Sequence, residues 1–101
     1  TVGAAFDAKA LARELVGRQL VACVNIVERI HSVYRWNGAI EEEGEQLLVM
    51  KTMASRVDDL QRELLALHPY EVPEFLVLPV TQGSEPYLAW LAASTTPPPT
   101  R

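Results

Sequence analysis

The segment HPYEVPE at positions 68–74 brings an imidazole, a phenol and two carboxylates together around two prolines. The nitrogens of His68 and the oxygens of Glu71 and Glu74 suit a borderline divalent ion such as copper. Tyr70 can add a hydrogen bond to such a site. Their spacing alone is no metal motif. A structural explanation stands beside it, in which His68 ends a helix and complements its dipole, Glu71 is solvated and the prolines shape a loop.

Two further side chains could contribute chemistry from strands. Cys23 lies in an apolar stretch, where a cysteine most often acts as a small buried hydrophobe. The functional alternative is a soft copper ligand or a redox-sensitive thiol, with Asn25 on the same face of the strand. Lys51 follows four apolar residues, so its ammonium must leave the core at a strand end or meet a carboxylate such as Glu74. Lys51 and Glu74 beside His68 would form an anion or metabolite pocket, although structural pairing explains them equally.

Composition argues against several classes of function. Nine basic and thirteen acidic residues give the 101-residue chain a net charge of −4, and the scattered basic residues argue against nucleic acid as a partner. No apolar run approaches the roughly 20 residues that span a bilayer, so we expect no membrane partner. The single cysteine excludes an internal disulfide and fits a cytoplasmic protein. Because no phosphate-binding glycine loop, Gly-x-Ser-x-Gly or His-Glu-x-x-His pattern occurs, we expect neither enzymatic activity nor an organic cofactor.

The start of the chain predicts a helix followed by a strand. Asp7 can cap a helix over residues 7–18, whose apolar positions recur at helical spacing. Nearly every residue from 20 to 27 is apolar, which favours a strand buried on both faces, and this strand continues to Trp36. Tyr34 and Trp36 alternate on one face, where they could wall a small-molecule pocket or pack beneath another subunit.

A hairpin turn is expected next. Asn37 and Gly38 can supply the positive φ angles of a two-residue turn, so the return strand should begin at Ala39. The acidic run at 41–45 is expected to interrupt this strand as a solvated bulge. The strand should resume over 46–53, again apolar on both faces.

A second helix follows the hairpin. Ser55 with Asp58 and Asp59 predicts its start, favoured by side-chain capping and by the helix dipole. The apolar stripe of this helix consists of Val57, Leu60, Leu64 and Leu67. His68 is expected in the last turn, and Pro69 stops the helix.

The remaining elements indicate an α+β, ferredoxin-like fold. Residues 75–80 predict a short final strand and 84–93 a third helix, while the proline-rich residues 95–101 are expected to form a disordered tail. Residues 1–3 look like the end of an opening strand that is frayed here or completed upstream. Residues 1–94 would then be one domain with the split βαβ order βαββαβ plus a C-terminal helix. Its sheet would be antiparallel, with helices on one face.

The strand pattern also predicts an oligomer. Two helices can cover only one face of a four-stranded sheet, whereas the strands at 20–27 and 46–53 are apolar on both faces. Another subunit is therefore expected to cover the second face, through sheet packing or strand addition.

Several motifs together resemble the CutA family of divalent-cation tolerance proteins, over nearly the whole chain. Besides HPYEVPE at 68–74, the matching runs are ACVNI at 22–26, YRWNG at 34–38, MKT at 50–52 and YLAWL at 87–91. The resemblance implies a homotrimer that responds to metal ions and binds Cu(II) or a similar divalent ion at subunit interfaces. The positions carried over from these motifs are Cys23, Trp36, Lys51, His68, Tyr70 and Glu74.

Two other functions remain as alternatives. A ferredoxin-like trimer resembling the PII regulators would hold a small anion in clefts between subunits, with Trp36, Lys51 and Arg35 more important than Cys23. An enzyme would use His68 or Glu74 as a general base, with Tyr70 as the acid. The sequence names no substrate for it.

Overall fold

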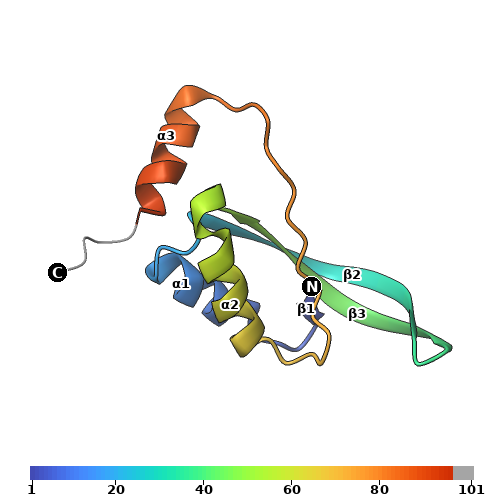
Figure 1. The fold of residues 1–101 in the computed structure, drawn as a ribbon. Helices are drawn as coiled ribbons and strands as arrows, with labels where there is room; N and C mark the ends of the chain where they lie inside the picture. The colour runs from blue at the N-terminus through green and yellow to red at the C-terminus, as the bar shows by residue number, and fades with distance from the viewer. Residues whose placement is uncertain (97–101) are drawn as a thin grey trace.

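A long, bent β-hairpin is the largest element of the fold, and two helices pack beside its base (Figure 1). The computed structural model describes residues 1–96. The elements are β1 (Val2–Gly3), α1 (Ala8–Gly17), β2 (Cys23–Trp36), β3 (Ala39–Lys51), a 3-10 turn (Ala54–Arg56), α2 (Val57–Leu67) and α3 (Glu85–Ser94). The α+β class is confirmed, and the sheet has three antiparallel strands in the order β1-β3-β2. Most of the predicted tail, from residue 97 onward, lies outside the described residues.

Helix α1 forms as predicted. The Asp7 carboxylate caps it by accepting a hydrogen bond from the Ala10 amide at 3.0 Å. After the helix, Gln19 adopts a left-handed φ of 59°, and the Leu20 amide donates to the Leu15 carbonyl. This turn redirects the chain toward the sheet while keeping the backbone groups at the helix end paired.

The predicted hairpin turn is confirmed. Asn37 and Gly38 have φ values of 50° and 78°, and the ladder runs from Trp36 opposite Ala39 to Cys23 opposite Lys51. The first hairpin strand begins at Cys23 rather than at residue 20. The three residues before it are buried without belonging to the sheet, because they connect α1 to the hairpin through the core.

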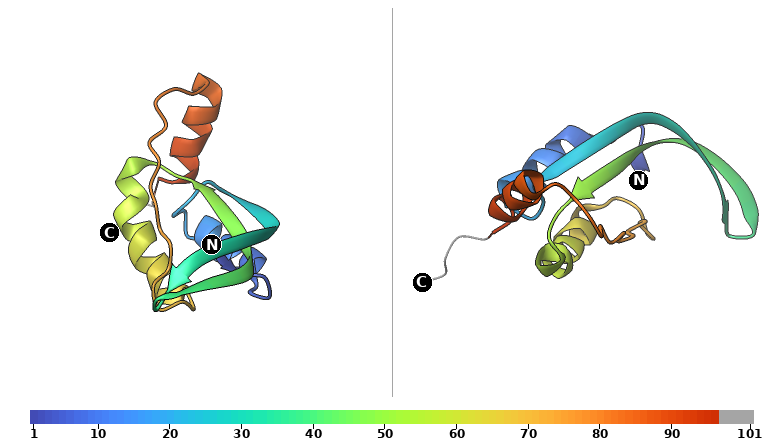
Figure 2. Two further views of the ribbon diagram at one scale, coloured as in Figure 1. Left: turned by 90° about the vertical axis from the view of Figure 1, so that its right-hand side faces the viewer. Right: turned by 90° about the horizontal axis from the view of Figure 1, so that it is seen from above.

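The acidic run at 41–45 does not interrupt its strand, which corrects the prediction. Strand β3 is continuous, and each residue of the run pairs in register with a residue of β2. The irregularity lies instead in β2, between Val27 and Ile30, where Arg29 adopts a φ of 61°. A bulge adds residues to one strand and bends it. Figure 2 shows the hairpin arm curving away from the helices, so Glu41, Glu42 and Glu43 are solvated without leaving the sheet, whereas Glu45 is buried.

The core lies between the helices and one face of the sheet. Val24 and Met50 are register partners and face it, so alternation places Val27 and Val49 on the opposite face. Val27 and Val49 are 44% and 42% exposed. The buried core consists of Leu11, Leu15, Leu20, Val21, Leu60 and Leu64.

Helix α2 begins differently from the prediction. Ser55 lies inside the 3-10 turn, and the position before α2 is Arg56, which makes no side-chain capping bond. Asp58 and Asp59 do occupy the first turn. The Arg56 guanidinium pairs with the Asp59 carboxylate at 2.8 Å, so an ion pair replaces the expected serine cap. The helix ends at Leu67, and His68 follows it in an extended conformation rather than in its last turn.

Residues 75–80 do not form the predicted final strand, so the described chain lacks the fourth strand of a ferredoxin-like sheet. Their backbone has no partner strand, since β1 contributes only two residues. Leu76, Leu78 and Val80 are 80%, 84% and 79% exposed. This segment leads to α3, which forms close to the predicted range but stands apart from α1 and α2 (Figures 1 and 2). Its C-cap, Thr95, is buried and donates its hydroxyl hydrogen to the Leu91 carbonyl.

Candidate functional site

His68 is held by backbone groups on both sides of its ring. Its Nε2 lies 2.8 Å from the carbonyl oxygen of Thr1, and its Nδ1 accepts a hydrogen bond from the Tyr70 amide at 3.1 Å. A carbonyl oxygen can only accept, so Nε2 carries the hydrogen and Nδ1 offers its lone pair. Both ring nitrogens are therefore engaged within the chain.

Tyr70 ties the same loop to the sheet. Its hydroxyl donates to Oε2 of Glu45 on β3 at 2.9 Å, and its ring lies 4.8 Å from that of His68. Burial and the bond to the Glu45 carboxylate both raise the pKa of Tyr70. Because its pKa is raised, the phenol keeps its hydrogen and can donate it to the buried carboxylate of Glu45.

Glu45 was not singled out by sequence reasoning, yet it is the buried acid of this region, only 6% exposed. Burial alone would raise its pKa. Hydrogen bonds from Ser32, Tyr70 and Thr1 outweigh burial and hold the pKa of Glu45 below its ordinary value. In the sequence Glu45 looked like the last member of a solvated acidic run. Its burial could have been inferred from its position just before the apolar stretch at residues 47–50.

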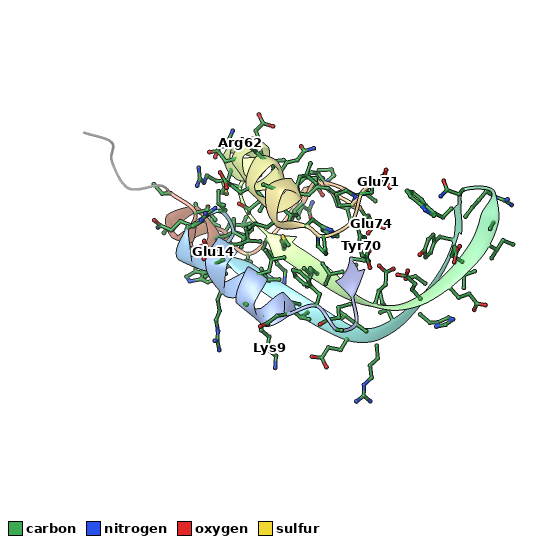
Figure 3. The ribbon with its side chains drawn as sticks, turned by 90° about the horizontal axis from the view of Figure 1, so that it is seen from below. Lys9, Glu14, Arg62, Tyr70, Glu71 and Glu74 are labelled. Carbon is green, nitrogen blue, oxygen red and sulfur yellow. The ribbon has the colours of Figure 1, made fainter. Side chains whose placement is uncertain are left out.

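Glu71 and Glu74 are exposed in the same loop, and Figure 3 shows both near Tyr70 on the side of the molecule that carries β1. Oε2 of Glu74 lies 4.0 Å from the nitrogen of Thr1. The expected pairing of Glu74 with Lys51 is not present. Among the described residues, Lys51 forms no ion pair with a carboxylate.

Lys51 instead meets Cys23 across the hairpin. The two residues are register partners, and the Lys51 ammonium donates to the Cys23 sulfur at 3.8 Å. The thiol lies 4.0 Å from Oδ1 of Asn25, as expected for residues on one face of a strand. This face is the one turned away from α1 and α2, so all three polar groups lie beside the exposed Val49.

The predicted site residues are therefore brought together only in part. Lys51 lies five residues along β3 from Gln46, the partner of β1, which corresponds to about 17 Å of strand. This length separates Cys23 and Lys51 from the loop of His68. Trp36 lies still farther away, at the tip of the hairpin opposite Ala39.

The described residues of this chain do not form a metal site by themselves. Within residues 1–96, no three His, Cys, Asp or Glu side chains gather in a group that could hold one. Cys23 lies opposite Lys51 at one end of the sheet, whereas His68 and Glu71 share the loop beside β1, which pairs with the middle of β3. The lone pair of His68 is already used. These three predicted ligands therefore form no metal site within residues 1–96. The same region of the chain contains no helix long and apolar enough to cross a bilayer.

Comparisons with known proteins agree with the motifs. The family model described as "CutA1 divalent ion tolerance protein" matches residues 1–94. The Protein CutA homolog of Xenopus laevis is 49% identical over 84 residues, which make up 83% of this chain and 56% of that protein. The chain spans between 48% and 56% of the length of the first four curated relatives.

Solved structures show the same fold. The divalent cation tolerance protein of Thermus thermophilus matches with a TM-score of 0.89 at 42% identity, covering 94% of this chain and 92% of that one. A PII-like protein CutA from Nostoc sp. PCC 7120, in apo form, matches with a TM-score of 0.82 at 36% identity, covering 87% and 86%. The resemblance inferred from the motifs is thereby confirmed, and the chain belongs to the CutA1 divalent ion tolerance family.

Proposed function

We propose that this chain acts in divalent-cation tolerance as a homotrimer that binds Cu(II) or a similar divalent ion where subunits meet. The observation that carries the proposal is the uncovered face of the sheet. Cys23 lies on that face, beside Val27 and Val49, which remain more than 40% exposed in one subunit. A neighbouring subunit that covers these valines would bring its own donors to the thiol.

Assembly is further supported by the segment at 75–80. It is apolar and has no strand partner among residues 1–96, and its exposed side chains are available to another chain. Strand addition would pair this backbone and bury Leu76 and Leu78. The number of subunits rests on the family resemblance.

Cys23 and Glu71 are the donors that best suit the proposed interface. The thiol is half-buried and hydrogen-bonds to the side chains of Lys51 and Asn25, and the Glu71 carboxylate is exposed. In one chain Cys23 lies at the Lys51 end of the sheet and Glu71 lies in the loop beside β1, so in this proposal two subunits present them to one ion. Binding, rather than catalytic turnover, is the activity proposed.

Calorimetric titration of metal-free trimer with Cu(II) tests this proposal. We expect saturable binding at about micromolar Kd or tighter, weakened at least about tenfold in Cys23→Ser and in Glu71→Gln. Glu28→Gln removes an exposed carboxylate from the hairpin and serves as the matched control. Equal, weak binding by all four proteins would reduce the metal effect to surface adsorption and contradict the proposal.

A second candidate is a signalling module that binds a small anion between subunits. The ammonium of Lys51 on the uncovered face favours it, since this group contacts the thiol rather than a carboxylate. The Nostoc relative is described as PII-like. Trp36, Tyr70 or Glu74 of a neighbouring subunit could complete such a pocket.

Thermal unfolding separates the two candidates. An anionic metabolite that raises Tm in the wild type and in Lys9→Met, but not in Lys51→Met, would support the signalling function. Stabilisation by Cu(II) with no response to anions would contradict it.

A further inference from the structure

We infer that His68 is a positioning residue that fixes the loop at residues 68–74 against β1, and that it is not a ligand for the divalent ion. This assignment goes beyond the proposed function and does not depend on it. The carrying observation is that each ring nitrogen already has a complementary backbone partner.

The two hydrogen bonds of His68 define one neutral form of its ring. The Nε2 hydrogen points to the Thr1 carbonyl, and the Nδ1 lone pair receives the Tyr70 N–H. The first bond joins the end of α2 to the strand at the edge of the sheet. The second closes a local turn of the loop itself. One side chain thus sets both the position and the internal shape of this loop.

Neighbouring contacts reinforce the same junction. The Tyr70 hydroxyl donates to Glu45, and the ring of Tyr70 packs against that of His68. From β3, the Gln46 side-chain amide donates to the carbonyls of Gly3 and Phe6 at 2.9 and 3.0 Å. The loop, β1 and β3 are therefore connected by a continuous set of polar contacts in which His68 supplies one donor and one acceptor.

Metal binding by His68 would oppose this arrangement. A metal ion needs the lone pair of a neutral imidazole nitrogen. At Nδ1 it would displace the Tyr70 N–H, and at Nε2 it would displace the hydrogen that reaches Thr1. Either change leaves a partly buried backbone group without its partner. The Cys23 sulfur, by contrast, contacts the side chains of Lys51 and Asn25 rather than a backbone group, and the Glu71 carboxylate is exposed.

Three substitutions separate positioning from ligation. His68→Asn places a side-chain carbonyl oxygen where Nδ1 lies, so it can still accept from the Tyr70 amide. His68→Gln instead keeps a side-chain donor for the Thr1 carbonyl. Ala retains neither group. The exposed His31, which pairs with Glu42 on the hairpin, provides the control variant His31→Asn.

Two measurements are made on each intact oligomer: hydrogen exchange of the Tyr70 amide and calorimetric titration with Cu(II). We expect slow exchange in the wild type, His31→Asn and His68→Asn, and exchange at least about tenfold faster in His68→Gln and His68→Ala. Cu(II) affinity should stay within about twofold of the wild type in His68→Asn.

Loss of Cu(II) binding in His68→Asn, with its Tyr70 amide still protected, would overturn the inference and establish His68 as a ligand. Rapid exchange of the Tyr70 amide in the wild type would also overturn it, because the Nδ1 contact would then be absent. If the wild type binds no Cu(II), the proposed metal function fails while the exchange measurement still decides the role of His68.

Discussion

At the scale of single residues, the Tyr70 hydroxyl donates a hydrogen bond to a buried carboxylate, that of Glu45. A carboxylate that is 6% exposed loses its hydration and must be compensated by donors. The Tyr70 hydroxyl is one of these donors and comes from the loop after α2, whereas Glu45 comes from the middle of β3. The pair therefore links two parts of the chain that are distant in sequence.

Removing the hydroxyl should destabilise the fold. We predict that Tyr70→Phe lowers the free energy of unfolding by about 1.5–3 kcal/mol, the usual range for a hydrogen bond to a charged group. Urea unfolding at neutral pH measures the change. Tyr87→Phe, at an exposed tyrosine on α3, is the control and should change stability by less than about 0.5 kcal/mol. Equal effects of the two substitutions would contradict the importance of the contact.

Glu45 also predicts the direction of an acid-induced loss of stability. Its pKa in the fold lies below the ordinary value of 4.5, so the unfolded chain binds more protons between the two values. The stabilising contribution is complete above the unfolded pKa and is lost as the pH falls through the folded pKa. Unfolding measured from about pH 6 to about pH 3 should show a weaker pH dependence in Glu45→Gln than in the wild type. Parallel curves would show that other carboxylates cause the acid transition.

Sequence reasoning identified the loop at 68–74 but not the roles of its members. His68 and Tyr70 stood out by type and by the prolines around them. Their partners are the Thr1 carbonyl, a backbone amide and Glu45, and none of these is distinguished by residue pattern. Donor and acceptor roles are set by long-range packing, which a local motif does not encode.

At the scale of elements, local residue chemistry determines the turn of the hairpin but not the position of its bulge. Asn37 and Gly38 predicted the turn because both residues tolerate positive φ, and the structure confirms this. The bulge was placed in the wrong strand. The run of glutamates predicts an interruption, but exposed charged side chains are compatible with a continuous strand, and the buried Glu45 is compensated by the Tyr70 hydroxyl. Arg29, at the actual bulge, gave no local signal.

Gly38 provides a test of the turn. An alanine there would meet no neighbour within 4 Å, yet it would have to adopt a φ of 78°. We predict that Gly38→Ala destabilises the protein by about 1–2 kcal/mol through backbone conformation alone. Gly17→Ala is the matched control. Its new methyl group also has open space, but its φ is not positive, so stability should be unchanged or slightly higher. Equal losses at both glycines would contradict this explanation.

Residues 75–80 are predicted as the final strand, but they pair with no strand among the described residues. Residues 75–80 have the composition of a strand, and Phe75 does pack against the core. The rest of the segment stays unpaired, since β1 is too short to offer a ladder along its length. Residues with high strand propensity form a strand where they can pair with a neighbouring strand and half-bury their side chains. Residues 1–96 provide no such neighbour for the segment at 75–80.

At the scale of the whole molecule, the chain leaves apolar groups uncovered on the outer face of the sheet and in the segment at 75–80, among other places. Val49 belongs to the first and Leu78 to the second, and they remain 42% and 84% exposed. α3 adds Tyr87 and Trp90, whose rings pack on each other while both stay exposed. Surfaces of this kind favour association with further copies of the chain.

Leu78→Glu tests whether the segment at 75–80 takes part in assembly. Because Leu78 is exposed within one subunit, the substitution should leave the subunit fold intact, as circular dichroism would verify. Burial of this leucine between subunits is worth about 1.5–3 kcal/mol, so the charged variant should dissociate at protein concentrations about ten- to a hundredfold higher than the wild type. Sedimentation equilibrium measures the mass of each. Gln82→Glu adds the same charge at an exposed polar position nearby and should keep the mass of the wild type. If Leu78→Glu also keeps that mass across the dilution series, assembly proceeds without this segment and the uncovered face of the sheet becomes the interface to test with Val49→Glu.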